Sequence, residues 1–281
     1  MRNSLQCASS AQPTFGVVIR FKNSAATLPG VLEALRRQTV QPDIIVGVNN
    51  QSADGSVAMM RTAGAKIIDW NEPYSHPRVL NHGIRNCPTD LVLVLSSHTV
   101  LRSADAIARL LGALEDPRTA CVSGRWDDDP FYSDAISWQE LLAKGLKFGS
   151  IYSNSFGMLR RERWEEMPFD EALPTMEDYA WALEQVRHGH VCRRVNFEFS
   201  YQRGGRSRYF LFAAVTFRLA ARYSLPVAWL GPRGTARELV LSAATRSRNG
   251  EQGTTIESRS RVHRQRLWAW LTWRLKMNLS E

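Results

Sequence analysis

The chain has 281 residues, of which 44% are hydrophobic and 22% are charged. This length and composition fit one large globular domain, or a domain with an appendage, and exclude a generally disordered or collagen-like chain. The four cysteines, Cys7, Cys87, Cys121 and Cys192, form no C-x-x-C pair, which excludes a zinc ribbon and argues against a disulfide scaffold. We therefore expect free thiols in a reducing cytosol.

The positive charge is concentrated toward the C-terminus. The net charge is +9 for the whole chain, but residues 203–281 carry +11 and residues 1–202 carry −2. A strongly basic segment indicates an acidic partner, and composition leaves a nucleic acid, an anionic lipid and a phosphorylated substrate open. No base-reading motif accompanies the basic segment, so we expect no specific nucleic acid partner.

Targeting signals and membrane spans are not expected. The first 14 residues lack the apolar run of a secretory signal. The most apolar long window, residues 210–230, contains two arginines and a proline, whereas a spanning helix needs about 20 predominantly apolar residues. We expect a cytoplasmic protein. Residues 264–279 mix tryptophans with basic residues, which suits either a helix lying on the inner face of a membrane or a helix packed on the protein body.

Strand and helix patterns alternate in the first third of the chain. Four apolar runs predict strands, at residues 15–21, 43–48, 65–69 and 91–95. Three segments between them predict helices, at residues 28–38, 56–63 and 78–86. The alternation predicts βαβ units and a mostly parallel sheet, and the unbroken run LVLVL is typical of a strand buried on both faces.

The pattern is looser after residue 102. It predicts helices at residues 104–114, at 177–188 and from about 209. It predicts strands at residues 120–124 and 191–201, with an acidic loop at 125–134. The second half is therefore expected to contain both helices and strands, without the regular alternation of the first.

Polar residues follow three of the predicted strands: Arg20 to Asn23, Asn49 to Gly55, and Ser96 to His98. Ligands of open α/β sheets bind outside the carboxyl ends of the strands, although the same residue types also favour ordinary turns. Neither G-x-G-x-x-G nor G-x-x-x-x-G-K-[ST] is present, so a nucleotide would need its phosphates neutralised by Arg or by a metal.

Three side chains are candidates for chemistry. His98 follows a buried strand and is the best metal-ligand candidate, although a single His is more often a hydrogen-bonded structural residue. Glu177 and Asp178 open a predicted helix, where acids complement the helix dipole. A carboxylate that faces a cleft can also act as a general base, and position alone does not decide between these roles.

Taken in order, these blocks resemble the inverting glycosyltransferases of family 2, and most closely their rhamnosyltransferase-like subgroup. The resemblance covers residues 15–200 and is carried by VVIRFKNSAATLPGVLEALRRQTVQPDIIVGVNNQSADGS, YSHPRVLNHGIRNCPTDLVLVL and YSNSFGMLRRERWEEMPFDEALPTMEDYAWALEQVRHGH. It implies an α/β protein with the GT-A fold, which is the Rossmann-like fold of nucleotide-diphospho-sugar transferases. A mostly parallel central sheet and a helical, basic C-terminal extension are expected.

The resemblance also implies a domain organisation. Residues 1–14 would be an N-terminal tail, residues 15–202 the catalytic domain, and residues 203–281 a basic helical region. Within the catalytic domain, residues 15–102 would bind the nucleotide and residues 103–202 the acceptor.

The implied reaction moves a sugar from a nucleotide-diphosphate donor to a hydroxyl group of a glycan or lipid-linked acceptor, with inversion, in the synthesis of cell-surface polysaccharide. Asp178 would be the catalytic base, and Glu177 would orient it or share the role. The implied donor-binding residues are Arg20, Asn23, Asn49, Asp54, Arg78, Asn81, Ser96 and His98. Trp181 and Trp126 are acceptor candidates, with core packing and a solvated loop as their respective alternatives.

Two motifs depart from the family pattern. The D-x-D that grips the diphosphate through Mg²⁺ or Mn²⁺ is Ser96-Ser97-His98 here, and the Asp that reads the nucleobase is Asn49. A divalent metal would therefore rely on His98, which could also bind the diphosphate directly. Arginines after residue 202 are an alternative source of neutralising charge. The rival interpretation is a catalytically impaired GT-A-fold binding or scaffold protein.

Overall fold

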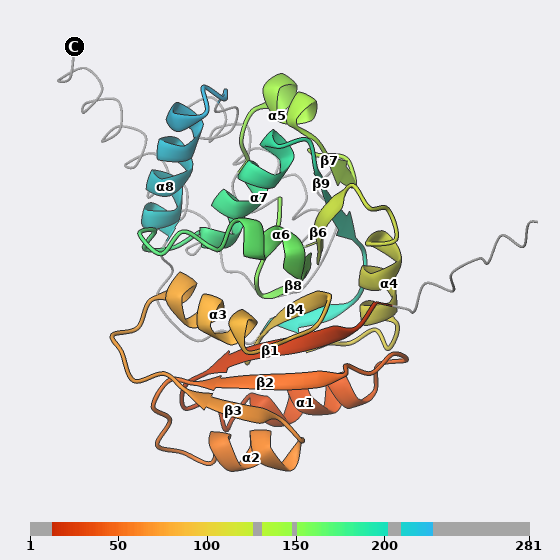
Figure 1. Ribbon diagram of the computed structural model, residues 1–281, viewed down its shortest axis with the longest axis vertical. Helices are drawn as coiled ribbons and strands as arrows, with labels where there is room; N and C mark the ends of the chain where they lie inside the picture. The colour runs from red at the N-terminus through yellow and green to blue at the C-terminus, as the bar shows by residue number, and fades with distance from the viewer. Residues whose placement is uncertain (1–12, 126–130, 148–150, 202–208, 227–281) are drawn as a thin grey trace, which may run out of the picture.

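The computed structural model describes residues 13–125, 131–147, 151–201 and 209–226. The strands of the main sheet are β1 (Phe15–Phe21), β2 (Ile44–Asn49), β3 (Lys66–Asp69), β4 (Leu91–Ser96), β6 (Thr119–Gly124), β7 (Ala135–Ile136), β8 (Phe156–Arg160) and β9 (Val191–Val195). Their order is β3-β2-β1-β4-β8-β6-β9-β7 (Figure 1). A second, two-stranded sheet pairs β5 (Thr99–Leu101) with β10 (Phe199–Tyr201).

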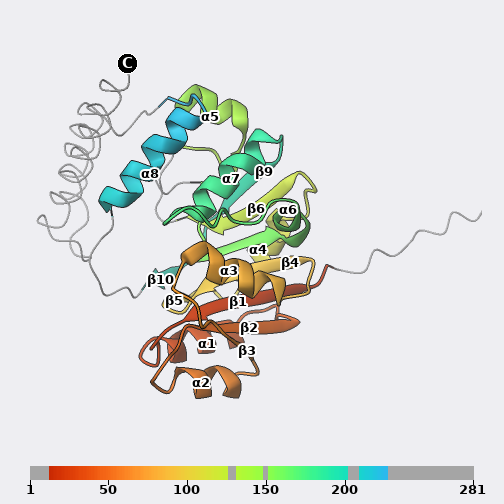
Figure 2. The ribbon, with the colours of Figure 1, turned by 60° about the vertical axis from the view of Figure 1, so that its left-hand side comes forward.

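Helices cover both faces of the main sheet. They are α1 (Leu28–Arg36), α2 (Ser56–Thr62), α3 (His76–Arg85), α4 (Ala106–Ala113), α5 (Trp138–Lys144), α6 (Arg161–Glu166), α7 (Glu177–Arg187) and α8 (Tyr209–Arg222). Buried residues of α1, α2 and α4 form one core, and those of α3, α7 and α8 form the other. Figure 2 shows α3 on one side of β1–β3 and α1 and α2 on the other.

The first part of the chain, residues 15–101, has the predicted parallel sheet. β1 pairs in parallel with both β2 and β4, and β2 pairs in parallel with β3. Along β1, Val18 faces the α3 core whereas Ile19 faces the α1 core, because successive side chains of a strand point to opposite faces. Gly83 lets α3 approach β1 closely, since a Cβ at this position would lie 2.6 Å from a Val18 methyl carbon.

The part of the main sheet formed after residue 102 is mixed. β8 lies antiparallel between β4 and β6, and β6 then pairs in parallel with β9. The sequence patterns did not predict β5, β7, β8, α5 or α6. The expected single strand 191–201 is wrong: residues 196–198 break it, because β9 pairs within the main sheet whereas β10 pairs with β5.

Helix α8 shares a hydrophobic core with the main sheet and α7, although the expected domain boundary at residue 202 precedes it. Its residues Val215, Leu219 and Ala220 are buried in the same core as α7. The Tyr223 hydroxyl donates a hydrogen bond to the Glu184 carboxylate of α7. The described part of the basic C-terminal region therefore packs on α7 and its core, and residues 227–281 lie outside the described residues.

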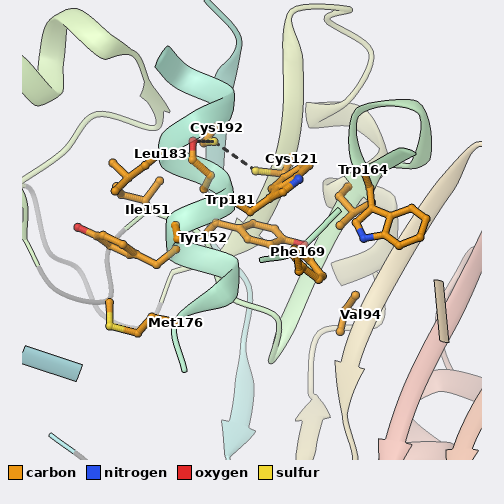
Figure 3. Close-up of a cluster of buried hydrophobic side chains, with 14 of the residues drawn as sticks. Val94, Cys121, Ile151, Tyr152, Trp164, Phe169, Met176, Trp181, Leu183 and Cys192 are labelled. Atoms are coloured by element: carbon orange, nitrogen blue, oxygen red, sulfur yellow. Dashed lines mark hydrogen bonds between the residues drawn. The ribbon is translucent and has the colours of Figure 1, made fainter. Parts of the chain in front are cut away.

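Among the described residues, no helix combines the length and the apolar character that crossing a bilayer requires. Cys87, Cys121 and Cys192 are free and buried, as expected for structural thiols. The thiols of Cys121 and Cys192 lie 3.2 Å apart on the paired strands β6 and β9 (Figure 3).

Candidate active site

The carboxyl ends of β1 and β4 bring the first two candidate residues together. Arg20 and Ser96 are register partners on these parallel strands, so their side chains point to the same face of the sheet. The Ser96 N–H donates to the Ser155 carbonyl at 3.0 Å, which places the turn before β8 against this edge. The ends of β1 and β4 therefore lie next to the turn that precedes β8.

The carboxylate pair, Glu177 and Asp178, lies at the start of α7. Asp178 Oδ2 accepts a hydrogen bond from the Asn154 N–H at 2.9 Å, and its Oδ1 accepts one from the Tyr179 N–H at 2.8 Å. Asn154 immediately precedes Ser155, so the pair lies next to the ends of β1 and β4. Glu177 is 5% exposed, whereas Asp178 is half-buried and is the more accessible of the two acids.

The backbone before the pair is in a rare conformation. Met176 has a φ of 62°, in the left-handed region that side chains other than glycine seldom adopt. Such conformations persist where the surroundings hold them, and they are common at active sites. Met176 is buried, and the Thr216 hydroxyl of α8 lies 3.7 Å from its sulfur. The turn and α8 together fix the direction in which Glu177 and Asp178 leave the helix.

Burial controls the protonation of both acids. Burial raises the pKa of Glu177 to about 7, and the neighbouring Asp178 charge adds to this effect. Burial also raises the pKa of Asp178, but the N–H groups of Asn154 and Tyr179 and the charge of Arg20 oppose that shift. Asp178 is therefore the acid better suited to stay ionised, which is the state that a general base needs.

Arg20 forms a hydrogen-bonded cluster with Tyr74 and His76, of which the sequence patterns indicated only Arg20. Its Nη1 donates to the Tyr74 hydroxyl at 2.5 Å, and that hydroxyl lies 3.2 Å from His76 Nδ1. Tyr74 comes from the polar loop after β3 and His76 is the first residue of α3, and residue spacing alone offers no sign of a shared role. The loop thus brings a tyrosine to the guanidinium whose charge acts on the acid pair.

The Ser96-Ser97-His98 turn does not match a binding site for a hard divalent cation. The Ser96 hydroxyl lies 3.0 Å from His98 Nε2, and the His98 ring packs edge-on against Tyr201. Mg²⁺ and Mn²⁺ prefer oxygen ligands, mainly carboxylates, but this turn offers one imidazole and hydroxyl groups. Within the described ranges, no three His, Cys, Asp or Glu side chains come together.

The ends of β1 and β2 are tied together by the residues expected to bind the nucleoside. Asn23 Oδ1 accepts from the Ala53 N–H at 2.8 Å, and Asp54 Oδ2 accepts from the Ala25 N–H at 2.9 Å. Asn49 donates to Asp69 Oδ1 at 2.8 Å. These side chains shape the two loops through internal hydrogen bonds.

Arg78 lies beside this edge, on α3. Its guanidinium carbon is 5.5 Å from the centre of the Trp70 ring, and it forms ion pairs with Glu72 and Glu171. The side chain is 39% exposed, so it can still meet a ligand at the strand ends.

Two expected ligand-binding residues are structural instead. Asn81 is 1% exposed, and all of its hydrogen-bonding positions are filled by neighbours: Trp164 Nε1 and the Phe169 N–H donate to it, whereas the Phe169 carbonyl and Glu171 Oε1 accept from it. Asn81 therefore cannot contact the donor directly without losing these bonds. It holds the segment that leads to the acid pair.

Trp181, which was expected to contact the acceptor, is also a structural residue. It is 3% exposed and packs against Phe169 and Tyr152, and its indole N–H donates to the Met167 carbonyl at 2.6 Å (Figure 3). A buried ring with a satisfied N–H is a core residue, not a stacking platform for an acceptor sugar. Trp126, the other acceptor candidate, lies outside the described residues.

The same architecture occurs in solved glycosyltransferases. Mannosyltransferase PcManGT from Pyrobaculum calidifontis, in complex with GDP-Man and Mn²⁺, matches with a TM-score of 0.63 at 17% identity, over 86% of this chain and 77% of that one. Glucosyl-3-phosphoglycerate synthase from Mycobacterium tuberculosis matches with a TM-score of 0.56 at 16% identity, over 77% of this chain and 82% of that one. The fold is therefore GT-A, that of the nucleotide-diphospho-sugar transferases.

Sequence comparison adds the family. The family described as Glycosyl transferase family 2 matches residues 16–172, which is more than half of the chain. The chain belongs to glycosyl transferase family 2. The O-antigen chain rhamnosyltransferase RfbN of Salmonella typhimurium is 25% identical over 193 residues, or 62% of this chain. The match spans 61% of the length of that relative.

Proposed function

We propose that the protein transfers a sugar from a nucleotide-diphosphate donor to a hydroxyl group of a glycan or lipid-linked acceptor, with inversion, in the synthesis of a cell-surface polysaccharide. Membership of glycosyl transferase family 2 supports the reaction class, and the likeness to an O-antigen chain rhamnosyltransferase supports the pathway class. The observation that carries the proposal is the Asp178 carboxylate, held by two backbone N–H groups beside the strand ends.

In this reaction Asp178 takes the proton of the acceptor hydroxyl as its oxygen attacks the anomeric carbon. The new bond joins the acceptor oxygen to that carbon, and the bond between the carbon and the donor phosphate oxygen breaks. The nucleoside diphosphate leaves with the bonding electrons. Attack from the face opposite the leaving group inverts the configuration. A positioned carboxylate base contributes about 10²–10⁴-fold to such a step.

Glu177 and Arg20 set the charge on Asp178. Glu177 is buried beside it and favours its own protonated form, so the pair need not hold two adjacent negative charges. Arg20 supplies the opposing positive charge at the end of β1, next to Ser96. We assign Arg20, Ser96 and His98 to the diphosphate side of the donor, with Asn23, Asn49, Asp54 and Arg78 around the nucleoside.

The resemblance predicts a divalent metal at the diphosphate with His98 as its protein ligand, although the hydroxyl and imidazole groups of this turn suit a hard cation poorly. Donor binding measured with MnCl₂ and again with EDTA, in wild-type protein and in His98→Ala, tests this prediction. Loss of binding on adding EDTA to the wild type supports a metal. Equal binding under both conditions contradicts it.

A cytoplasmic location, with contact to the inner face of the membrane through the basic residues beyond 226, also remains a proposal. It rests on the charge of +11 in residues 203–281. Sedimentation of the full chain with liposomes containing anionic lipid tests it. Binding that disappears in neutral liposomes supports the proposal, and an absence of binding to either contradicts it.

The experiment for the transferase proposal is a screen of GDP-mannose, UDP-glucose, UDP-GlcNAc and dTDP-rhamnose by thermal shift, followed by an assay of donor hydrolysis. A ligand that binds the folded state stabilises it by RT ln(1 + [L]/Kd), so even weak donors are detectable at millimolar concentration. Stabilisation together with release of the nucleoside diphosphate supports the enzyme. Stabilisation without release or transfer points to the scaffold interpretation, and no stabilisation by any donor contradicts the proposal.

A further inference from the structure

Two neighbouring side chains at the ends of β2 and β3 form an unusual pair. Asn49 and Asp69 are register partners on these parallel strands, and Asn49 Nδ2 donates to Asp69 Oδ1 at 2.8 Å. The oxygen of the same amide accepts from the Ser52 N–H at 2.9 Å. The Asn49 side chain is thus fixed from both ends, and one of its bonds holds a carboxylate on the next strand.

The two partners differ in accessibility. Asn49 is 9% exposed, whereas Asp69 is exposed at the same edge of the sheet. Among the described residues, no Lys, Arg or His forms an ion pair with Asp69; its hydrogen-bond partner is the Asn49 amide. A carboxylate has about four lone-pair positions, so Asp69 keeps most of its accepting capacity for a ligand.

The surroundings place this carboxylate in the nucleoside region. The Trp70 N–H donates to the Asn49 carbonyl at 2.8 Å, which anchors the chain directly after Asp69 to the end of β2. The Asn23 N–H donates to the Ser52 hydroxyl at 3.1 Å, which brings the loop after β1 to the same place. The ends of β1, β2 and β3 therefore meet around the Asn49–Asp69 pair.

We infer that Asp69 reads the nucleobase of the donor and selects bases that carry a ring N–H on their pairing edge, namely guanine, uracil or thymine. This inference rests on the proposed transferase function and names the donor class for it. Asn49 acts as a positioning residue, because it holds the carboxylate instead of supplying one. The carboxylate that accepts the hydrogen bond from the base is therefore on β3, one strand further toward the edge of the sheet than Asn49 on β2.

The selection follows from hydrogen-bond chemistry. An ionised carboxylate only accepts hydrogen bonds. Guanine N1–H and the N3–H of uracil and thymine donate to it, whereas adenine N1 and cytosine N3 present lone pairs at the corresponding position. A site built around a polar group discriminates strongly against ligands that leave this group unpaired. Adenine and cytosine offer this carboxylate only an exocyclic amino group beside a ring lone pair that repels it, so their nucleotides are expected to bind more weakly.

The test is the binding of GDP, UDP, dTDP, ADP and CDP to the full chain, by calorimetry, in three proteins: wild type, Asp69→Asn and Glu115→Gln. Asp69→Asn keeps the shape of the side chain and an oxygen that accepts the hydrogen bond from Asn49. It replaces the other carboxylate oxygen with an NH₂ group, which donates hydrogen bonds and cannot accept one from the base. Glu115→Gln is the matched control, because it removes one exposed negative charge beyond α4. Thermal unfolding without ligand checks that all three proteins fold.

We expect wild type and Glu115→Gln to bind at least one of GDP, UDP and dTDP about 10-fold or more tightly than ADP and CDP. Asp69→Asn is expected to weaken that binding about 10- to 100-fold, the range for a lost hydrogen bond to a charged group, and to reduce the preference. The relative affinities of GDP and the two pyrimidine nucleotides identify the base. Tight ADP or CDP binding, or a preference unchanged in Asp69→Asn, overturns the inference but leaves the transferase function standing. An absence of binding to all five nucleotides contradicts both.

Discussion

Replacing Glu177 with Gln tests the electrostatics of the acid pair. The side chain is 5% exposed, and burial is the main cause that raises the pKa of its carboxyl to about 7. Glutamine has nearly the same shape, keeps an oxygen for Asn154 Nδ2, and carries no charge at any pH. Glu177→Gln therefore removes the cost of ionising a buried carboxyl and little else.

The size and sign of the effect follow from the two pKa values. Between pH 4.5, the ordinary value, and about 7, the folded protein binds more protons at this site than the unfolded chain does. The wild type therefore loses stability as the pH rises through this window. At roughly 1 kcal/mol or a little more for each pKa unit, its free energy of unfolding should fall by roughly 2–3 kcal/mol between pH 5 and pH 8 because of this group.

The assay is urea denaturation of wild type and Glu177→Gln at pH 5, 6, 7 and 8. Titrating groups that do not interact with Glu177 contribute equally to both proteins, so the difference between the two free energies reports Glu177 together with its interaction with Asp178. The stability of the variant relative to the wild type should rise by roughly 2–3 kcal/mol from pH 5 to pH 8, with most of the rise complete by pH 7. Parallel pH dependences in the two proteins would refute the raised pKa.

Three further predictions concern neighbouring residues. Trp181→Ala should lower the free energy of unfolding by about 3–5 kcal/mol, because it leaves a cavity at a buried site, and urea denaturation measures this loss. A variant as stable as the wild type that binds the acceptor more weakly would instead support Trp181 as an acceptor-binding residue. Asn81→Ala should cost about 2–4 kcal/mol, because it leaves Trp164 Nε1 and the Phe169 N–H without partners, and donor affinity of the folded fraction measured by calorimetry should not change. Arg20→Met removes a charge that lowers the pKa of Asp178, so the acidic limb of the kcat–pH profile should move to higher pH; an unmoved limb would show that Arg20 does not act on the base.

The fold of residues 15–96 could be predicted from the sequence because its signals are local. Each buried strand is a short apolar run followed by polar residues, as in LVLVL and Ser96, and the parallel order follows from the helices between the strands. β8 carries no comparable signal: five residues, FGMLR, lie antiparallel between β4 and β6, and this pairing depends on contacts distant in the sequence. The GT-A fold itself was expected from the order of the motif blocks and is confirmed.

The site was predictable in its residues more than in their roles. Glu177 and Asp178 start α7 as expected, but the Asn154 N–H that holds Asp178 comes from a turn with no recognisable pattern. Helical spacing placed Trp181 near the face of Asp178. However, α7 is buried on most sides, so spacing could not distinguish a cleft from the core. Asn81 was expected to bind the donor, and its structural role could not be foreseen for a similar reason, since its partners are 83 to 90 residues away in the sequence.

The central claim is that Asp178 is the base for glycosyl transfer, and turnover of Asp178→Asn tests it most directly. The measurement uses the donor found in the nucleotide-sugar screen, with Glu166→Gln, an exposed acid of α6, as the matched control. We predict that Asp178→Asn loses about 10²–10⁴-fold in kcat while the donor still stabilises the protein as it does the wild type, and that Glu166→Gln keeps full turnover. Turnover of Asp178→Asn within a few-fold of the wild type would contradict the account.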